Sequence, residues 1–463
     1  MQDEKNSLKL IFHGGAETVT GVNFLLETPD EKPTRVLFDC GLLQGEKVGE
    51  ERNAMPFQYD PTTIDALFIS HAHIDHTGRI PKLVKDGFRG TIYSTPPTKE
   101  VARLLLLDSI GILSKEAHAA GLEPLYDEHD VEHAMELWKT LDYHQSENVG
   151  SLTFRLLDAG HVLGSSMIEC AYKKTKLVYS GDLGNSPAPF LRDTEKLPDD
   201  VDYLLVESVY GDRNHEHREE RKAILEDVIE ETMHQGGTLV IPAFSFERTQ
   251  ELLFEVKGMV EASRIPLVPV YLDSPLAINV TTVYEKYLSY YKDLPHMTHY
   301  AGDTPFAFPQ LHKTLTTDQS KAIAHVRGPK IVIAGSGMSN GGRIVHHEKL
   351  YLPDPKNTLL ILGYQAVGTL GRLIQEGMKK IRIFGEEVPV RARVVTIGGY
   401  SAHKDSDHLL AFVEDAADSV KRVYVVLGEP KSSLFLTQKI RDFLGLDARV
   451  PSPGQVVYLP LNK

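Results

Sequence analysis

Three histidines and one aspartate lie within six residues of one another in the stretch 70–76, which reads Ser-His-Ala-His-Ile-Asp-His. They directly follow an apolar run that predicts a buried strand. Because a loop leaving a strand end can turn several side chains toward one point, we expect His71 and His73 to bind a first metal ion. Asp75 and His76 are expected to bind a second ion beside it. Nitrogen and carboxylate donors without a thiolate favour zinc, or failing that manganese or iron. A loop that is merely rich in histidine is the alternative, but the order His-x-His-x-Asp-His is far more specific.

This motif resembles the signature of the metallo-β-lactamase fold, whose later loops complete the site. Two later predicted strands, 152–157 and 177–179, each lead through a glycine-containing turn to one candidate ligand. The first leads to His161, the expected third ligand of the first metal, and the second leads to Asp182, the expected bridge between both metals. Either residue alone is a weak signal, since Gly-Asp is an ordinary turn, but their order after the histidine motif is specific.

Asp39 follows another predicted strand, 35–38, next to a glycine. One interpretation is a residue that starts a turn. The other interpretation is a carboxylate beneath the metals that orients water or braces a ligand. The resemblance favours this role, because an aspartate at this place precedes the histidine motif in the superfamily.

Length and composition bound the class of protein. A chain of 463 residues with 41% hydrophobic and 25% charged residues predicts a soluble globular protein of two domains. No apolar run approaches the ~20 residues of a membrane span, and the polar start lacks the layout of a secretory signal. The two cysteines, Cys40 and Cys170, provide no disulfide framework, which favours a cytoplasmic protein.

The charge of the chain is unevenly distributed. A formal net charge of -14 argues against nucleic acid as a partner. However, residues 321–393 contain 12 Lys or Arg and 5 Asp or Glu, a local excess of +7. Such clusters are often only solvated faces, but this one leaves a nucleic-acid partner open.

The order of the predicted elements indicates one domain interrupted by another. After a predicted strand at 203–206, strands and helices alternate regularly, which implies a parallel sheet covered by helices. The predicted domains are a first part at 1–208, an inserted domain at 209–390, and a returning part at 391–463. His129 and His133, four residues apart on a helix predicted at 128–141, are interpreted as residues of a surface helix.

Six motifs together resemble the β-CASP family of metallo-β-lactamase-fold nucleases over nearly the whole chain. Four of them are Asp39, the histidine motif at 71–76, His161 and Asp182. The other two are Glu207 after its strand and His403 in a Ser-Ala-His segment. The resemblance is closest to the RNA-processing branch of the family. It implies an α/β fold: an αββα sandwich interrupted by a β-CASP domain with a parallel sheet flanked by helices.

The sequence departs from the family pattern in its middle β-CASP motif. A histidine is common just after Gly-Thr-Leu-x-x, where this chain has Leu373. Leu373 cannot transfer a proton as that family histidine would, and His346 or His347 are candidates to take its place.

The resemblance implies a ribonuclease that hydrolyses RNA phosphodiester bonds with a hydroxide activated by two zinc ions, with manganese as the other candidate. The substrate would lie in the cleft between the two domains. The first metal would be bound by His71, His73 and His161, and the second by Asp75, His76 and His403, with Asp182 between them. Asp39 would orient the bridging hydroxide, and Glu207 would brace His403.

Candidate RNA contacts lie around the glycine-rich turn at 335–342, whose backbone N–H groups precede a helix and are suited to a phosphate. They are Ser336, Gly337, Arg343, His346 and Arg372. A tight strand–helix turn is the alternative. Single-stranded RNA is the expected partner, a membrane is not, and a homo-oligomer stays open.

Other functions remain as alternatives. A glyoxalase II-like thioesterase would use the same metals, but it needs no long insertion. A non-catalytic RNA-processing subunit would be expected to lose ligands, and here every position is filled. DNA-acting relatives usually lack the histidine found at His403. Endonuclease action is expected, with 5′-exonuclease action as the alternative.

Overall fold

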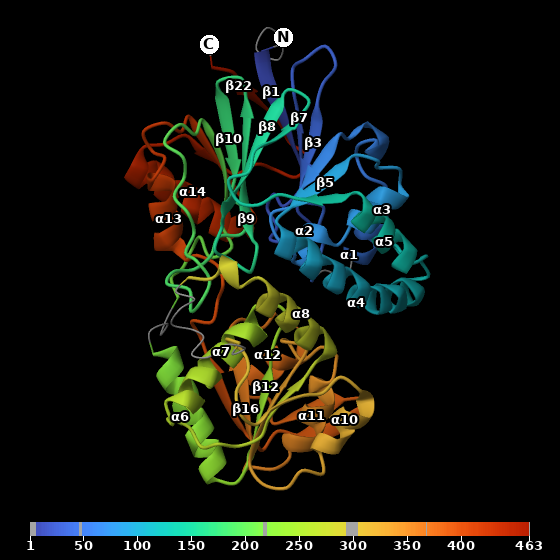
Figure 1. The fold of residues 1–463 in the computed structure, drawn as a ribbon, viewed down its shortest axis with the longest axis vertical. Coiled ribbons are helices and arrows are strands. Elements are labelled where there is room, and N and C mark those ends of the chain that lie inside the picture. The colour runs from blue at the N-terminus through green and yellow to red at the C-terminus, as the bar shows by residue number, and fades with distance from the viewer. Residues whose placement is uncertain (1–5, 46–48, 216–219, 293–303, 367, 463) are drawn as a thin grey trace. The chain divides into compact units, whose positions relative to one another are not determined.

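The chain folds into two compact units. The structure, a computed structural model, describes residues 6–45, 49–215, 220–292, 304–366 and 368–462 (Figure 1). Unit 1 consists of Met1–Asn214 and Ala402–Lys463, and unit 2 of His215–Ser401. Unit 2 is therefore an insertion in unit 1. The units divide at 214/215 and 401/402, whereas the sequence places the boundaries at 208/209 and 390/391.

Unit 1 contains two seven-stranded sheets. The first has, in spatial order, β22 (Val456–Pro460), β1 (Ser7–Gly14), β2 (Asn23–Glu27), β3 (Arg35–Phe38), β4 (Ala66–Phe68), β5 (Thr91–Ser94) and β6 (Trp138–Thr140). The second has β21 (Ala448–Arg449), β20 (Arg422–Val426), β11 (Tyr203–Glu207), β10 (Thr175–Tyr179), β9 (Ser166–Tyr172), β8 (Leu152–Asp158) and β7 (Glu147–Val149).

The core of unit 1 lies between these two sheets and is rich in aromatic side chains. Phe68 of the first sheet stacks on Phe154 of the second, with ring centroids 4.0 Å apart. Phe24 and Tyr179 meet edge to face at 5.4 Å. Burying large rings from both sheets in one cluster stabilises the sandwich and fixes the level at which its strands end.

Helices cover the outer faces of unit 1 (Figure 1). The second sheet packs on α13 and α14 through residues such as Phe412 and Leu436. None of the described helices is long and apolar enough to cross a membrane. The helices of unit 1 are α1 (Gly49–Ala54), α2 (Ile74–Thr77), α3 (Ile80–Lys85), α4 (Pro96–Ala120), α5 (Glu128–Glu136), α13 (Ser406–Glu414) and α14 (Pro430–Leu444), with a 3-10 turn at Pro61–Thr63.

The returning segment completes both sheets of unit 1. Strand β20 pairs in parallel with β11, so that Tyr424 lies opposite Leu205. Strand β22 pairs antiparallel with β1, so that Leu459 lies opposite Leu8. Unit 1 is therefore incomplete without the last sixty or so residues of the chain.

Unit 2 is built on a six-stranded parallel sheet. Its order is β14 (Leu311–Lys313), β13 (Val270–Asp273), β15 (Lys330–Ala334), β12 (Thr238–Pro242), β16 (Thr358–Leu362) and β19 (Arg393–Ile397). The helices are α6 (Arg221–His234), α7 (Arg248–Glu261), α8 (Pro275–Lys286), α10 (Thr317–Ile323), α11 (Ile344–Tyr351) and α12 (Leu370–Gln375), with a 3-10 turn at Leu288–Tyr290 and a hairpin of β17 (Lys380–Ile383) and β18 (Glu386–Pro389).

Several elements differ from the sequence predictions. The helix predicted at 128–141 ends at Glu136, and Trp138–Thr140 forms a strand instead, because it pairs with β5. The sequence predicts a helix at 98–113 capped by Thr98, whereas α4 is longer and is capped by Thr95, whose side chain accepts the Thr98 backbone N–H. The strand near 391–397 belongs to unit 2, because it pairs with β16. The sequence also predicts an irregular segment at 290–317, because several Pro, His and aromatic residues occur there, and part of this segment lies outside the described residues.

Candidate metal centre

Loops that follow strands of both sheets bring the predicted ligands together at one end of unit 1. His71 and His73 follow β4, and the short helix α2 carries Asp75 and His76. His161 follows β8, Asp182 follows β10, and His403 precedes α13. Ligands far apart in the sequence therefore share one site because their strands end at the same level of the sandwich.

The loops that carry His161, Asp182 and His403 meet at Gly184. This residue forms an isolated β-bridge with His403, and its backbone N–H donates to the carbonyl of Ala159. A Cβ at Gly184 would lie 1.8 Å from the carbonyl oxygen of Gly160, so no other residue fits there without displacing a loop. The glycine thus holds the segments of His161, Asp182 and His403 against one another.

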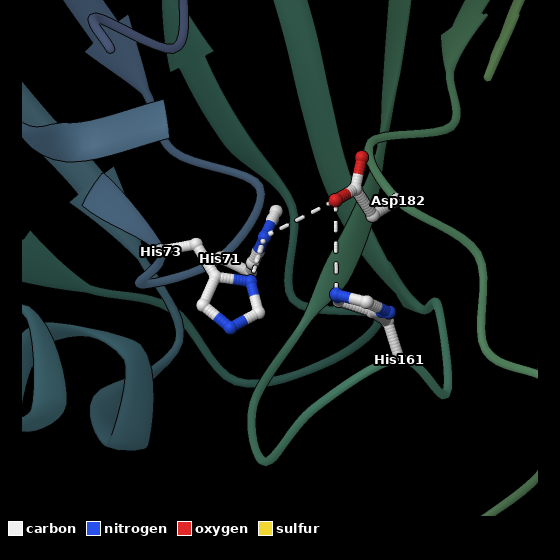
Figure 2. A group of neighbouring side chains, drawn as sticks. All are labelled: His71, His73, His161 and Asp182. Carbon is white, nitrogen blue, oxygen red and sulfur yellow. Dashed lines mark hydrogen bonds and ion pairs between the residues drawn. The ribbon is translucent and has the colours of Figure 1, made fainter. Parts of the chain in front are cut away.

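The first donor group consists of His71, His73, His161 and Asp182, each of which offers one atom within 4.8 Å of the others (Figure 2). His71 Nε2 lies 2.9 Å from His73 Nδ1 and 3.5 Å from Asp182 Oδ2. His161 Nε2 lies 3.7 Å from the same carboxylate oxygen. Three imidazoles facing one carboxylate form a donor set suited to zinc.

A second set of donors also lies around the Asp182 carboxylate. His76 Nε2 is 3.5 Å from Asp182 Oδ1 and 3.9 Å from Asp75 Oδ2. His403 Nδ1 is 3.9 Å from Asp182 Oδ2, and Asp182, Glu207 and His403 form a further compact donor group. Asp182 is thus placed to serve two neighbouring cations.

Asp39 holds the histidine motif from beneath. Its side chain is completely buried and accepts hydrogen bonds from the Ser70 backbone N–H and hydroxyl, each at 2.7 Å, and from the Tyr179 hydroxyl at 2.8 Å. His76 Nδ1 lies 2.7 Å from Asp39 Oδ2. Protein groups therefore occupy both oxygens, and this geometry suits Asp39 to bracing the ring of His76, one of the two roles considered for it from the sequence.

Glu207 has the corresponding position beside His403. Its Oε1 atom lies 3.3 Å from His403 Nδ1 and also accepts the backbone N–H of Leu183 at 2.6 Å. Because Leu183 adjoins Asp182, one buried carboxylate links two ligand loops. This contact corresponds to the brace on His403 that the family resemblance implies.

Burial favours neutral imidazoles in the first donor group. It lowers the pKa of His71 and of His161 well below the usual value, and the surrounding histidines add to this effect. Both rings therefore keep a nitrogen lone pair free for a cation near neutral pH.

Carboxylates dominate the second donor group. Burial alone would lower the pKa of His76, but Asp182 and Asp39 outweigh it and raise that pKa to about 10. Burial likewise opposes a charge on His403, and Glu207 raises its pKa to about 9. A concentration of negative charge that draws protons onto His76 and His403 is also an environment that attracts divalent cations.

The buried nitrogens fit a metal site. His76 Nε2 and His161 Nε2 make no hydrogen bond to any part of the chain that the structure describes, although both are buried. Such atoms are costly to leave without a partner. Cations at these two nitrogens would satisfy both, so the donor set present here fits two metal ions.

A third potential donor group, Asp127, His129 and Asp130, is mostly exposed. Its two aspartates form the capping box of α5, and Asp130 also pairs with Lys85 at 3.6 Å. This matches the interpretation of His129 and His133 as residues of a surface helix.

The candidate RNA contacts lie in unit 2, and several of them already have partners within the fold. Arg343 donates to Asp273 Oδ1 at 2.7 Å and to the carbonyls of Thr314 and Leu315, so its guanidinium is committed to the fold. Arg372 is paired with Glu376 at 2.7 Å. Ser336 accepts the Asn340 backbone N–H within the turn, and Gly337 is buried.

The two histidines considered in place of Leu373 have other surroundings. His346 is exposed and packs on Phe384, with ring centroids 4.6 Å apart. His347 is buried, with Nε2 2.7 Å from Asp273 Oδ2. Leu373 itself is 37% exposed, so its side chain leaves that part of the surface apolar.

Sequence reasoning missed two residues that hold the metal site in place, Tyr179 and Ser70. Tyr179 carries no motif of its own that indicates its hydrogen bond to Asp39. Ser70 could have been identified, because it adjoins the histidine motif and ends a buried strand.

Comparison with known protein families gives three matches in chain order. A metallo-β-lactamase superfamily domain matches residues 26–199, and a β-CASP domain matches 249–374. A Zn-dependent metallo-hydrolase RNA specificity domain matches 387–451.

Similar proteins cover almost the whole chain. Ribonuclease TTHA0252 of Thermus thermophilus is 39% identical over 93% of this chain and 95% of its own length. An RNase J-like protein of Methanocaldococcus jannaschii is 31% identical over 97% and 99%. The transcription termination factor FttA of Thermococcus kodakarensis is 33% identical over 95% of this chain and 69% of its own length. A crystal structure of a protein of unknown function from Enterococcus faecalis V583 shares the fold, with a TM-score of 0.56 and 13% identity over 98% of this chain and all of that one.

Proposed function

Because the chain belongs to the β-CASP ribonuclease family of the metallo-β-lactamase fold, we propose that it is a metal-dependent ribonuclease that hydrolyses phosphodiester bonds of single-stranded RNA. Family and fold class are as the sequence predicted, and both are confirmed. The observation that carries the proposal is the convergence of two buried donor sets on the carboxylate of Asp182.

We propose zinc as the native metal, two ions per chain, with manganese as the alternative. His71, His73 and His161 would hold one ion and Asp75, His76 and His403 the other, with Asp182 shared. When bound, such a pair supplies a water of lowered pKa and neutralises charge on the phosphate. The protein contributes the fixed direction of the donors: Asp39 sets the ring of His76, and Glu207 sets the ring of His403.

The rival functions have less support. An inert subunit would not need a complete donor set, and here all seven proposed ligand residues are present and meet in unit 1. A thioesterase for a small substrate needs no additional unit with a six-stranded sheet of its own. The similar proteins that are named ribonucleases also cover nearly the whole chain rather than the lactamase portion alone.

End-labelled RNA tests the proposal. Purified protein with its metal should cut a single-stranded RNA, and internal fragments are expected rather than successive mononucleotides from the 5′ end. A chelator should abolish cleavage, and zinc or manganese should restore it. A DNA of the same sequence and a glutathione thioester serve as competing substrates. Hydrolysis of the thioester with no cleavage of RNA would overturn the assignment.

A further inference from the structure

Two exposed aromatic side chains lie at the carboxyl edge of the parallel sheet in unit 2. Phe244 follows β12 by two residues and is 41% exposed, and Tyr364 follows β16 by two residues and is 53% exposed. Strands β12 and β16 are neighbours, with Val240 opposite Leu359 (Figure 1). Both rings therefore stand where the carboxyl ends of adjacent parallel strands place their loops, the usual ligand-binding edge of such a sheet.

The glycine-rich turn after β15 joins these two residues into one surface. A Cβ at Gly337 would lie 2.6 Å from Phe244 Cδ2, so the phenyl ring lies directly on the backbone of Gly337. Gln365, next to Tyr364, donates from Nε2 to the carbonyl of Gly337 at 3.0 Å. The loops after β12, β15 and β16 thus meet around a single glycine, with one aromatic residue after β12 and the other after β16.

Polar groups suited to a nucleotide backbone lie in the same turn. No hydrogen bond formed within the described part of the chain uses the backbone N–H of Gly337 or of Met338. Asn340 holds the neighbouring loop, since its Oδ1 accepts the backbone N–H of Leu370. The turn is therefore braced on both sides, and two of its backbone N–H groups are not used by the described part of the chain, which is the pattern a phosphate ligand requires.

Charge favours a nucleic acid as the occupant of this surface. The chain has a formal net charge of -14, yet residues 321–393, which include the turn and Tyr364, have 12 basic and 5 acidic residues. Glu348 within that stretch is buried, and burial raises its pKa to about 8, so it adds little negative charge at neutral pH.

We propose that Phe244 and Tyr364 form a stacking platform for unpaired bases of the RNA substrate, with the adjacent phosphate near the N–H groups of Gly337 and Met338. This inference rests on the proposed function and specifies its substrate class. Stacking on ring faces accepts any base, because every base has a π-face. The enzyme would therefore require unpaired nucleotides here without selecting their sequence.

The test measures RNA affinity and base stacking together. A fluorescein-labelled single-stranded RNA of about ten nucleotides, with one 2-aminopurine, is titrated into full-length protein made inactive by His73→Ala. Tyr364→Ala and Phe244→Leu should each weaken affinity about five- to a hundred-fold, as expected for the loss of one stacked base. The quenching of 2-aminopurine on binding should also be reduced. Tyr364→Phe, which keeps the ring, should restore both signals.

Salt dependence distinguishes stacking from phosphate contacts. The aromatic variants should keep the wild-type slope of log affinity against log salt, because no cation is removed. Phe443→Ala, which removes a phenyl group that is 73% exposed in unit 1, is the matched control and should leave affinity unchanged.

The possible failures of the inference and of the proposed function can be told apart. Wild-type affinity and quenching in both folded aromatic variants would overturn the platform and leave the ribonuclease proposal in place. Failure of Tyr364→Phe to restore binding would also overturn it, since the ring would then not be what the RNA contacts. A protein with metal that neither binds nor cleaves RNA would overturn both.

Discussion

Asp39 acts on the metal centre through other side chains. It receives the Tyr179 hydroxyl and both donors of Ser70, and His76 lies 2.7 Å away. A fully hydrogen-bonded carboxylate fixes the ring orientation of its histidine, and such partners commonly contribute 10- to 100-fold to metal affinity. At the scale of single residues, the ligands are therefore only half of the site.

Asp39→Asn should lower the affinity for zinc by about 10- to 100-fold and lower RNA cleavage with it, because the amide cannot accept from all four donors. Competition with a chromogenic chelator measures the affinity. Asp200→Asn, at an exposed carboxylate of unit 1 that pairs with Lys176, should change neither quantity. Unaltered zinc affinity in Asp39→Asn would contradict the positioning role.

Glu348 is expected to make the stability of unit 2 depend on pH. Its side chain is fully buried and accepts the hydroxyl of Ser339, and burial raises its pKa to about 8, above the ordinary glutamate value of 4.5. Below about pH 4.5 the carboxyl is protonated in both the folded and the unfolded chain, and the stability has its full value. As the pH rises toward 8, the unfolded chain releases this proton while the folded chain keeps it, so the free energy of unfolding falls. Each pH unit in that window costs up to about 1.4 kcal/mol.

Glu348→Gln should remove this dependence and make the protein more stable than wild type at pH 8 by about 3 kcal/mol, after any difference at pH 5 is subtracted. Denaturant unfolding at several pH values measures it. Parallel pH profiles for variant and wild type would show that the buried carboxyl does not titrate in this window.

At the scale of elements, Asp273 is a buried carboxylate that joins several strands and helices of unit 2. It ends β13, and four side chains from other elements donate to it or lie within hydrogen-bonding distance: Thr314, Ser320, Arg343 and His347. Burial would raise the pKa of Asp273, but these hydrogen bonds outweigh it and hold the pKa well below the usual range. One carboxylate thus joins the ends of β13 and β14 to α10 and α11.

Asp273→Ala should destabilise unit 2 by about 3–5 kcal/mol, because it leaves the cation of Arg343 without its buried partner. The lowered pKa means that ionised Asp273 stabilises the folded state above the pKa of the unfolded chain, and that this stabilisation is lost as the pH falls. The variant lacks this carboxylate, so it should lose less stability than wild type below about pH 4. Thermal unfolding at pH 7 and pH 3 measures both effects. Asp318→Ala, at an exposed residue of α10, is the control; an equal loss there would refute the argument.

The candidate ligands could be predicted because each follows an apolar strand that is visible in the sequence. Their supports could not: Tyr179 reaches Asp39 across 140 positions, through the packing of two sheets. Arg343 stands out in the sequence because it adjoins glycines, and its ion-pair partner Asp273, at the end of β13, lies 70 positions earlier. The apolar strand at 393–397 carries no signal of which sheet it joins, so its pairing with β16 of unit 2 could not be predicted.

At the scale of the whole molecule, the chain leaves unit 1 and returns to complete it. His76 and His403 are 327 positions apart, yet both lie beside Asp182. Unit 2, in contrast, is continuous, with its own sheet and its own buried core. The two units should therefore differ in whether they fold alone.

A fragment of residues 215–401 should fold by itself, because its sheet and core are complete. A fragment that ends at residue 401 should fail to form unit 1, because β20 and β22 are missing. Circular dichroism during heating checks both expectations. A cooperative transition from unit 1 in the truncated chain would contradict the interdependence of its two parts.

The most direct test of the account is the number of metal ions per chain, measured by mass spectrometry of metals alongside RNA cleavage. Wild type should hold about two zinc ions, from the donor sets that meet at Asp182. His403→Ala should hold about one, keep its fold and lose cleavage by orders of magnitude, and Asp182→Ala should lose both metal and cleavage. Full cleavage of RNA by a metal-depleted wild type, or an unchanged count in His403→Ala, would contradict a ribonuclease centre completed by the returning segment.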